Sequence, residues 1–142
     1  YGAEMRGGTA NCSVIISDEK IGAPIVPEAT AVIVMNRPSL DTFESSVTPG
    51  GLLLVNSSLI DVKTKRTDVE AHYIPCNEIA AKVGNARTAN IVMLGAFIEL
   101  TKAITPEEAM NALREAFGKE KEHLMPINEK ALAAGAAAVR KE

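Results

Sequence analysis

The sequence has few aromatic and thiol side chains, and these shortages exclude several classes of protein. It contains no tryptophan, and aromatic residues make up 4% of its 142 positions. That is too few for the stacking platforms that bind single-stranded nucleic acid. Its two cysteines, Cys12 and Cys76, stand far apart and form no CxxC pair. The chain alone therefore cannot build a zinc site or an iron–sulfur cluster.

Basic charge and long apolar runs are also scarce. The formal net charge is −3, so the basic footprint of a nucleic-acid-binding protein is missing. The one basic cluster, residues 63–66, is flanked by acidic residues and predicts a solvated loop. The run of large apolar residues at 91–98 falls well short of the ~20 residues that cross a membrane. With no signal peptide and no cysteine pair, we expect a cytoplasmic protein.

Apolar runs bounded by turn residues predict the strands. Such runs occupy residues 11–17, 30–36, 52–56 and 69–75, with a turn expected at residues 49–51. The runs at 30–36 and 52–56 are apolar almost throughout, which is typical of parallel strands buried on both faces.

Helical patterns fill the spaces between and after these strands. They cover residues 37–47, with Ser39 as the expected N-cap, and residues 77–84, 88–103, 105–117 and 126–142. Thr105 and Glu108 have the spacing of a capping box. The alternation predicts an α/β fold with three layers, in which a mostly parallel sheet is flanked by helices in a Rossmann-like manner. We expect residues 1–142 to form a single domain.

The carboxyl ends of the two buried strands are the first candidate site. In open α/β sheets, ligands bind beyond these ends, which here carry Asn36, Arg37, Asn56 and Ser57. Ordinary strand-to-helix turns with capping side chains are the alternative interpretation.

The opening stretch YGAEMRGG is the second candidate. Arg6 supplies a planar set of donors for a carboxylate or phosphate, and Gly7 and Gly8 let a ligand or another chain approach closely. Glu4 could orient Arg6. From these residues alone, a loop with both charges simply solvated is the alternative. His72, His123 and the two cysteines lack a motif that would make any of them a base or nucleophile. Cys12 is expected to be an inert core residue and Cys76 to be the more exposed of the two.

The longer stretch at residues 1–26 resembles the gamma subunits of the 2-oxoacid:ferredoxin oxidoreductases. That family carries a Tyr-Gly-x-Glu-x-Arg-Gly-Gly loop, followed by a strand that ends in Ser-Asp and by a later Pro. The positions that match the loop are Tyr1, Gly2, Glu4, Arg6, Gly7 and Gly8. Residues 50–60, 85–100 and 128–135 also resemble the family, so the likeness covers nearly the whole chain. Family members begin earlier, with a strand and a Gly-rich loop, which implies a sequence truncated at its amino end.

The resemblance implies a function. These enzymes oxidatively decarboxylate a 2-oxoacid with coenzyme A and reduce ferredoxin. It implies that thiamine diphosphate, magnesium and iron–sulfur clusters belong to the alpha, beta and delta partner subunits. No cofactor and no catalytic residue are then expected in this chain, and the opening loop is an interface or anion-binding loop. The 2-oxoglutarate type is favoured, with the pyruvate and 2-ketoisovalerate types open, and an isolated chain is expected to form a homodimer.

Two other functions compete with this one. A stand-alone α/β module could bind a nucleotide or coenzyme A, although the sequence has no GxGxxG or GxxxxGK[ST] phosphate fingerprint. A structural scaffold without any ligand is the third hypothesis.

Overall fold

A parallel sheet stands at the centre of the computed structural model, which describes residues 29–140. Within the described residues, three strands in the order β1-β2-β3 are paired in parallel. The strands are β1 (Ala29–Val34), β2 (Val47–Asn56) and β3 (Glu70–Ile74). The strand predicted at residues 11–17 and the opening loop lie outside the described residues.

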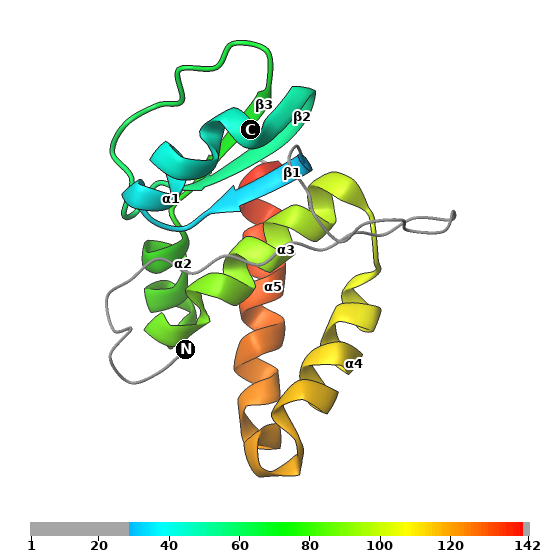
Figure 1. Ribbon diagram of the computed structural model, residues 1–142. Coiled ribbons are helices and arrows are strands. Elements are labelled where there is room, and N and C mark those ends of the chain that lie inside the picture. Colours follow the sequence, from blue (N-terminus) through cyan, green and yellow to red (C-terminus); the bar gives the residue numbers. More distant parts are fainter. Residues whose placement is uncertain (1–28, 141–142) are drawn as a thin grey trace, which may run out of the picture.

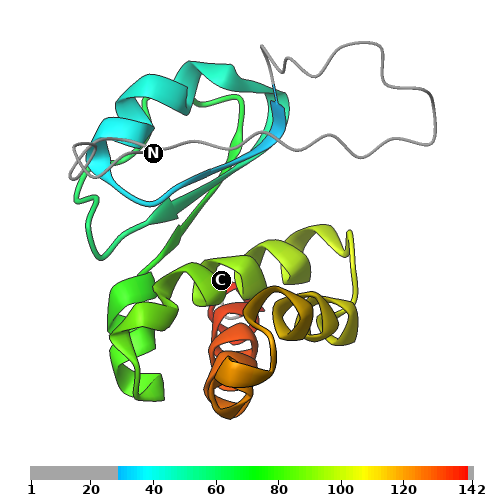
Figure 2. The same cartoon turned by 60° about the horizontal axis from the view of Figure 1, so that its bottom comes forward.

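Helices cover both faces of this sheet. The α-helices are α1 (Arg37–Phe43), α2 (Cys76–Val83), α3 (Ala89–Thr101), α4 (Pro106–Phe117) and α5 (Met125–Arg140). Short 3-10 helices are η2 (Glu44–Ser46), η3 (Ala86–Thr88) and η4 (Lys119–Leu124). Helix α1 lies on one face, and α2, α3 and α5 lie on the other (Figures 1 and 2). The predicted three-layer α/β fold is therefore confirmed.

Alternating side chains of the strands build two separate cores. Val34, Leu53 and Val55 face α1 and the 57–69 connection, where Leu40 and Ile60 close the layer. Leu54 and Ile74 face the opposite side and join the apolar faces of α2, α3 and α5. Residues 53–56 of β2 are 0% exposed on both faces and need no polar alternation. In β1 only Val34 is buried and Ile33 is 40% exposed, so the prediction of a strand buried on both faces is wrong for the run at 30–36.

Helices α3 and α5 cross at two glycines. A Cβ atom on Gly95 would lie 2.1 Å from the Leu132 carbonyl oxygen, and one on Gly135 would lie 1.8 Å from the Val92 carbonyl oxygen. Real Cβ atoms do not approach so closely, so only glycine permits this backbone contact. This crossing joins α5, the longest helix among the described residues, to the core that contains Leu54 and Ile74.

Several local predictions hold, and two are wrong. The capping box of α4 is present, and Gly84 ends α2 in the left-handed conformation. Ser39 is not the N-cap of α1, because its N–H donates to the Asn36 side chain, which makes Asn36 the cap. Residues 49–51 do not form a turn between elements. They lie inside β2, where Gly50 takes a positive φ and its N–H donates to the Asp68 carbonyl oxygen.

The basic cluster at 63–66 is more tightly held than a solvated loop. Arg66 donates to the carbonyl oxygens of Glu44 and Val47 and pairs with Asp68. The Glu44 carboxylate accepts from the Thr64 hydroxyl and the Lys65 N–H, and these bonds lower the pKa of Glu44. The cluster therefore fixes the 57–69 connection to η2. Asp68, one of the flanking acidic residues, is held in an ion pair with Arg66.

Candidate functional site at the carboxyl edge of the sheet

One buried amide ties the carboxyl ends of all three described strands together. Asn56, at the end of β2, is 0% exposed. Its Nδ2 donates to the Met35 carbonyl oxygen at 3.2 Å and to Asn77 Oδ1 at 2.8 Å. Its Oδ1 accepts from the Cys76 N–H at 3.1 Å and the Ser58 N–H at 3.3 Å. Both amide protons and the oxygen are used, so Asn56 has little capacity left for a ligand.

The turn after β2 also caps α2. The Cys76 N–H donates to Asn56, and the Glu78 N–H donates to Ser58 Oγ at 3.2 Å. Both donors belong to the first turn of α2, whose N–H groups have no partner within the helix. Pro75 at the cap position has no side-chain bond to offer. The start of α2 is thus fixed by residues from the neighbouring strand.

The predicted edge residues do lie near one another, but their polar groups are used in different ways. Asn36 caps α1, and Arg37 is exposed and pairs with Asp41 at 3.3 Å. Ser57 is partly buried, and its N–H donates to the Ile74 carbonyl oxygen at 2.9 Å. Asn36 therefore caps a helix and Asn56 links the strand ends. These are structural roles, as the alternative interpretation of ordinary strand-to-helix turns predicts. Contact with a ligand or a partner stays a prediction for all four residues.

Sequence reasoning placed Ser58 in the strand end at residues 56–58 but missed Asn77 and Leu59 at this edge. Asn77 and Ser58 complete the network of Asn56, and Leu59 is 56% exposed in the following turn. The signal for Asn77 was present, because the first polar residue after a parallel strand reaches the same edge as the ends of its neighbours. The pattern NSSL shows no periodicity that would reveal which of its residues points outward.

The sequence favoured Cys76 as the more exposed of the two cysteines, but the structure buries it, and Cys12 lies outside the described residues. Cys76 is 0% exposed because it begins α2 and packs into the helix-side core. Burial raises the pKa of its thiol to about 12. The thiol therefore stays protonated at neutral pH and is a poor nucleophile or metal ligand.

The two histidines lie apart from the edge. His72 Nε2 lies 2.9 Å from Glu70 Oε2 on β3, and the His72 side chain is 15% exposed. His123 is exposed in η4. Within residues 29–140, no group of three or more His, Cys, Asp or Glu side chains could hold a metal ion. No helix in that same span is long and apolar enough to cross a membrane.

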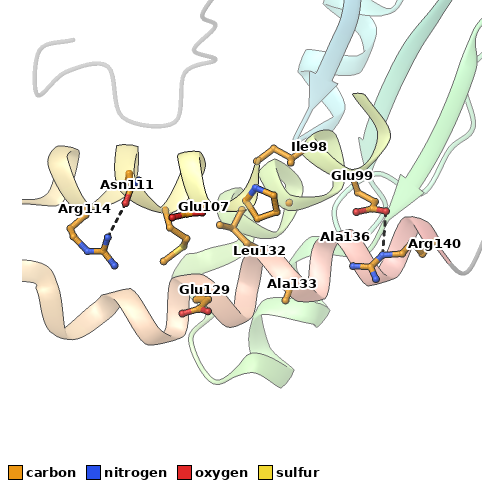
Figure 3. Close-up of a pocket in the computed structure, with 13 residues that line it drawn as sticks. Ile98, Glu99, Glu107, Asn111, Arg114, Glu129, Leu132, Ala133, Ala136 and Arg140 are labelled. Atoms are coloured by element: carbon orange, nitrogen blue, oxygen red, sulfur yellow. Dashed lines mark hydrogen bonds and ion pairs between the residues drawn. The ribbon is translucent and has the colours of Figure 1, made fainter. Parts of the chain in front are cut away.

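A cavity of about 540 Å³ lies away from the edge, between α3, α4 and α5. Its floor is apolar and includes Ile98 and Leu132, and charged side chains stand at its rim (Figure 3). The Arg140 guanidinium reaches Glu99 Oε1 at 3.4 Å, and Arg114 donates to Asn111. The rim charges are of both signs, so the cavity has no clear preference for an anion or a cation.

A second, more open cavity lies at the opposite end of the sheet. It has a volume of about 340 Å³, and its lining includes Thr30, Gly50 and Thr101. Neither cavity includes a residue of the carboxyl edge.

The fold and its edge define a parallel α/β domain whose strand ends are joined by a structural amide. Comparison with known proteins then gives its family. Residues 1–138 match the family described as "Pyruvate ferredoxin/flavodoxin oxidoreductase", and the chain belongs to that family.

Curated relatives of two kinds are similar to the chain. Ketoisovalerate oxidoreductase subunit VorA of Methanothermobacter marburgensis is 40% identical over 99% of the chain, which covers 29% of VorA. 2-Oxoglutarate synthase subunit KorC of Methanocaldococcus jannaschii is 32% identical over 90% of the chain, which covers 71% of KorC. The chain thus spans less than a third of the VorA relative and most of the KorC relative.

Solved structures share the fold. The gamma subunit of a keto/oxoacid ferredoxin oxidoreductase from Geobacter sulfurreducens superposes with a TM-score of 0.71 at 26% identity, covering 80% of this chain and 65% of that chain. The 2-oxoglutarate:ferredoxin oxidoreductase from Magnetococcus marinus superposes with a TM-score of 0.76 at 23% identity, covering 89% of this chain and 22% of that chain. At that identity the second likeness shows the fold alone.

Proposed function

We propose that this chain is the gamma-type part of a 2-oxoacid:ferredoxin oxidoreductase. The enzyme would convert a 2-oxoacid and coenzyme A to an acyl-CoA and carbon dioxide, and the two electrons released would reduce ferredoxin. The observation that carries the proposal is the family match over residues 1–138, together with the gamma-subunit fold of the described residues. The family match, rather than the fold, indicates the reaction, because one fold serves many functions.

The substrate class is a 2-oxoacid. Relatives of the ketoisovalerate type and of the 2-oxoglutarate type are both similar to the chain. We expected the 2-oxoglutarate type from the sequence, and the higher identity to VorA makes 2-ketoisovalerate an equal candidate. Both acids, and pyruvate, are therefore the substrates to compare in the assembled enzyme.

We propose that partner subunits hold the redox cofactors. Among the described residues, the one cysteine is a buried thiol with a raised pKa, and no cluster of metal-ligating side chains exists. These residues do not fit an iron–sulfur cluster, which needs several thiolates. We assign thiamine diphosphate, magnesium and the clusters to alpha, beta and delta subunits, with ferredoxin as the electron acceptor. The contribution of this chain is to position those subunits.

The opening loop is assigned to the interface with the alpha and beta subunits, or to an anion held there. Arg6 would contact an acidic or phosphate group, and the glycines at positions 7 and 8 would allow close approach. Tyr1, Gly2 and Glu4 belong to the same family motif.

Replacing Arg6 with alanine tests this assignment. A lost bidentate ion pair or phosphate contact should reduce turnover or assembly by at least about tenfold. The measurement is 2-oxoacid- and coenzyme-A-dependent reduction of an artificial acceptor, together with the stoichiometry of the purified complex. Arg87→Ala, an exposed change on η3, is the matched control. Unchanged assembly and unchanged turnover in the Arg6→Ala complex would end the assignment.

Two further experiments separate the competing functions. A complex prepared without this chain that keeps full activity would favour a purely structural scaffold. Tight binding of coenzyme A or a nucleotide to the isolated chain, measured by titration calorimetry, would favour the stand-alone module. Asn56, at the carboxyl edge, already uses its amide groups in hydrogen bonds within the chain, which argues against a ligand site of that module there.

A further inference from the structure

Helix α4 is attached to the rest of the helical layer by few buried side chains. Of its 12 residues, only Ala109 is buried. Its apolar residues Met110 and Leu113 are half-buried against the core that contains Leu54. By comparison, α3 and α5 each bury six residues. A helix with so few buried contacts moves away from its neighbours at a low free-energy cost.

A residue with a positive φ lies near each end of α4. Lys102 ends α3 with a φ of 55°, and Gly118 follows α4 with a φ of 71°. Lys102 is the one non-glycine residue with a positive φ in the described part of the chain, and a Cβ atom makes that conformation unfavourable. A Cβ atom on Gly118 would meet nothing within 4 Å, so glycine is needed there for its backbone conformation. Residues of this kind at the ends of elements are where hinges form.

The cavity of about 540 Å³ separates α4 from α3 and α5. Its lining includes the apolar side chains of Ile98, Leu132 and Met110, one from each of the three helices. Protein interiors are close-packed, and a space of this size leaves the lining side chains without van der Waals partners on one side. None of the charged residues at the rim is buried, so the cavity has no buried charge to orient a ligand. Movement of α4 toward α5 would restore apolar contacts.

Opposite charges stand on the two sides of this cavity. Arg114 near the end of α4 and Glu129 near the start of α5 both line it, and both are exposed. Figure 3 shows them on the side of the cavity away from Arg140. The Arg114 guanidinium donates to Asn111 of its own helix, and within residues 29–140 no ion pair joins α4 to α5. An Arg114–Glu129 pair becomes available only when α4 approaches α5.

We propose that α4 is a hinged lid, which turns about Lys102 and Gly118, closes the cavity against α5, and is held closed by an ion pair between Arg114 and Glu129. The structure shows the open position. Closure buries Met110 and the apolar floor of the cavity, which stabilises the closed position. This inference concerns two positions of one helix and goes beyond the proposed function without depending on it.

The distance between α4 and α5 in the full chain tests the proposal. Spin labels at Ala112→Cys on α4 and Lys130→Cys on α5, both exposed positions, report this distance by double electron–electron resonance. The labelled chain also carries Cys12→Ser. Cys76 stays unlabelled, because it is buried and its thiol has a pKa of about 12. We expect two populations of distances, one that matches the structure and a shorter one.

Variants of the ion pair show whether it holds the lid closed. Glu129→Gln should lower the shorter-distance population about two- to fivefold, the range that exposed ion pairs support. The charge exchange Arg114→Glu with Glu129→Arg should restore that population. Glu115→Gln makes the same change of charge on α4 at an exposed residue that does not line the cavity, so it should leave the population unchanged.

Two results would overturn the lid. The first is a single distance that matches the structure in the labelled chain with no further substitution. The second is a shorter-distance population that is equal with and without Glu129→Gln, because the helices would then close without the ion pair. Neither measurement needs the oxidoreductase subunits, so a failure of the lid is distinguishable from a failure of the proposed function.

Discussion

Gly135→Ala should destabilise the chain by more than about 3 kcal/mol. The new methyl group would lie 1.8 Å from the Val92 carbonyl oxygen, so α3 and α5 would have to separate where they cross. Helix propensity acts in the opposite direction, because alanine in place of glycine favours a helix by about 1 kcal/mol. The sign of the measured change therefore decides between backbone contact and propensity. Chemical denaturation of the isolated chain measures it.

Two further variants calibrate this prediction. Gly95→Ala places a methyl group 2.1 Å from the Leu132 carbonyl oxygen and should have an effect of similar size. Ala133→Ser adds one atom at an exposed position of α5 and should change stability by less than about 0.5 kcal/mol. Equal or greater stability of Gly135→Ala would show that the helices are not in backbone contact.

Asn56→Ala should cost about 3 kcal/mol of unfolding free energy. The change removes four hydrogen bonds and leaves the Cys76 N–H and the Met35 carbonyl oxygen without their partner at a site closed to water. Buried groups without a partner carry the full desolvation penalty. The loss should appear in thermal and denaturant unfolding alike.

A graded series shows whether the network acts as described. Asn77→Ala removes a single acceptor of Asn56 and should cost about 1 kcal/mol. Asn111→Ala, exposed on α4, should change stability by less than about 0.5 kcal/mol. An Asn56→Ala chain as stable as the Asn111→Ala control would mean that the amide is not the tie between the strand ends.

Local patterns predicted the elements of this fold well where one physical effect dominates. The apolar runs at 30–36 and 52–56 became β1 and the second half of β2, and in that half of β2 burial on both faces leaves few positions for polar side chains. The capping box that the spacing of Thr105 and Glu108 predicts is present. The layer arrangement followed from the alternation of these strands and helices.

Predictions that depend on contacts between distant segments failed. Residues 49–51 look like a turn, yet Gly50 pairs with the Asp68 carbonyl oxygen from the approach to β3 and stays within β2. The position of Cys76 after Pro75 at a strand end favoured exposure, and only the packing of α2 shows that the side chain is buried. The amide network of Asn56 joins residues up to 21 positions apart, which no local pattern contains.

The family assignment depended on a different kind of signal. The loop from Tyr1 to Gly8 has no periodicity and a weak chemical motif, and its value lay in matching a family position by position. The family match confirms that interpretation. What the loop contacts is not a property of the sequence alone, because its partner would belong to another subunit.

The most direct test of the central claim is anaerobic affinity purification of the tagged full-length gene product from its own host. We expect two large subunits and a small cluster-bearing subunit to co-purify. The brown complex should reduce an artificial acceptor when a 2-oxoacid and coenzyme A are both present, and the acid with the highest kcat/KM names the substrate. A chain that arrives alone and colourless, with no 2-oxoacid-dependent activity in the eluate, would contradict the assignment to this oxidoreductase.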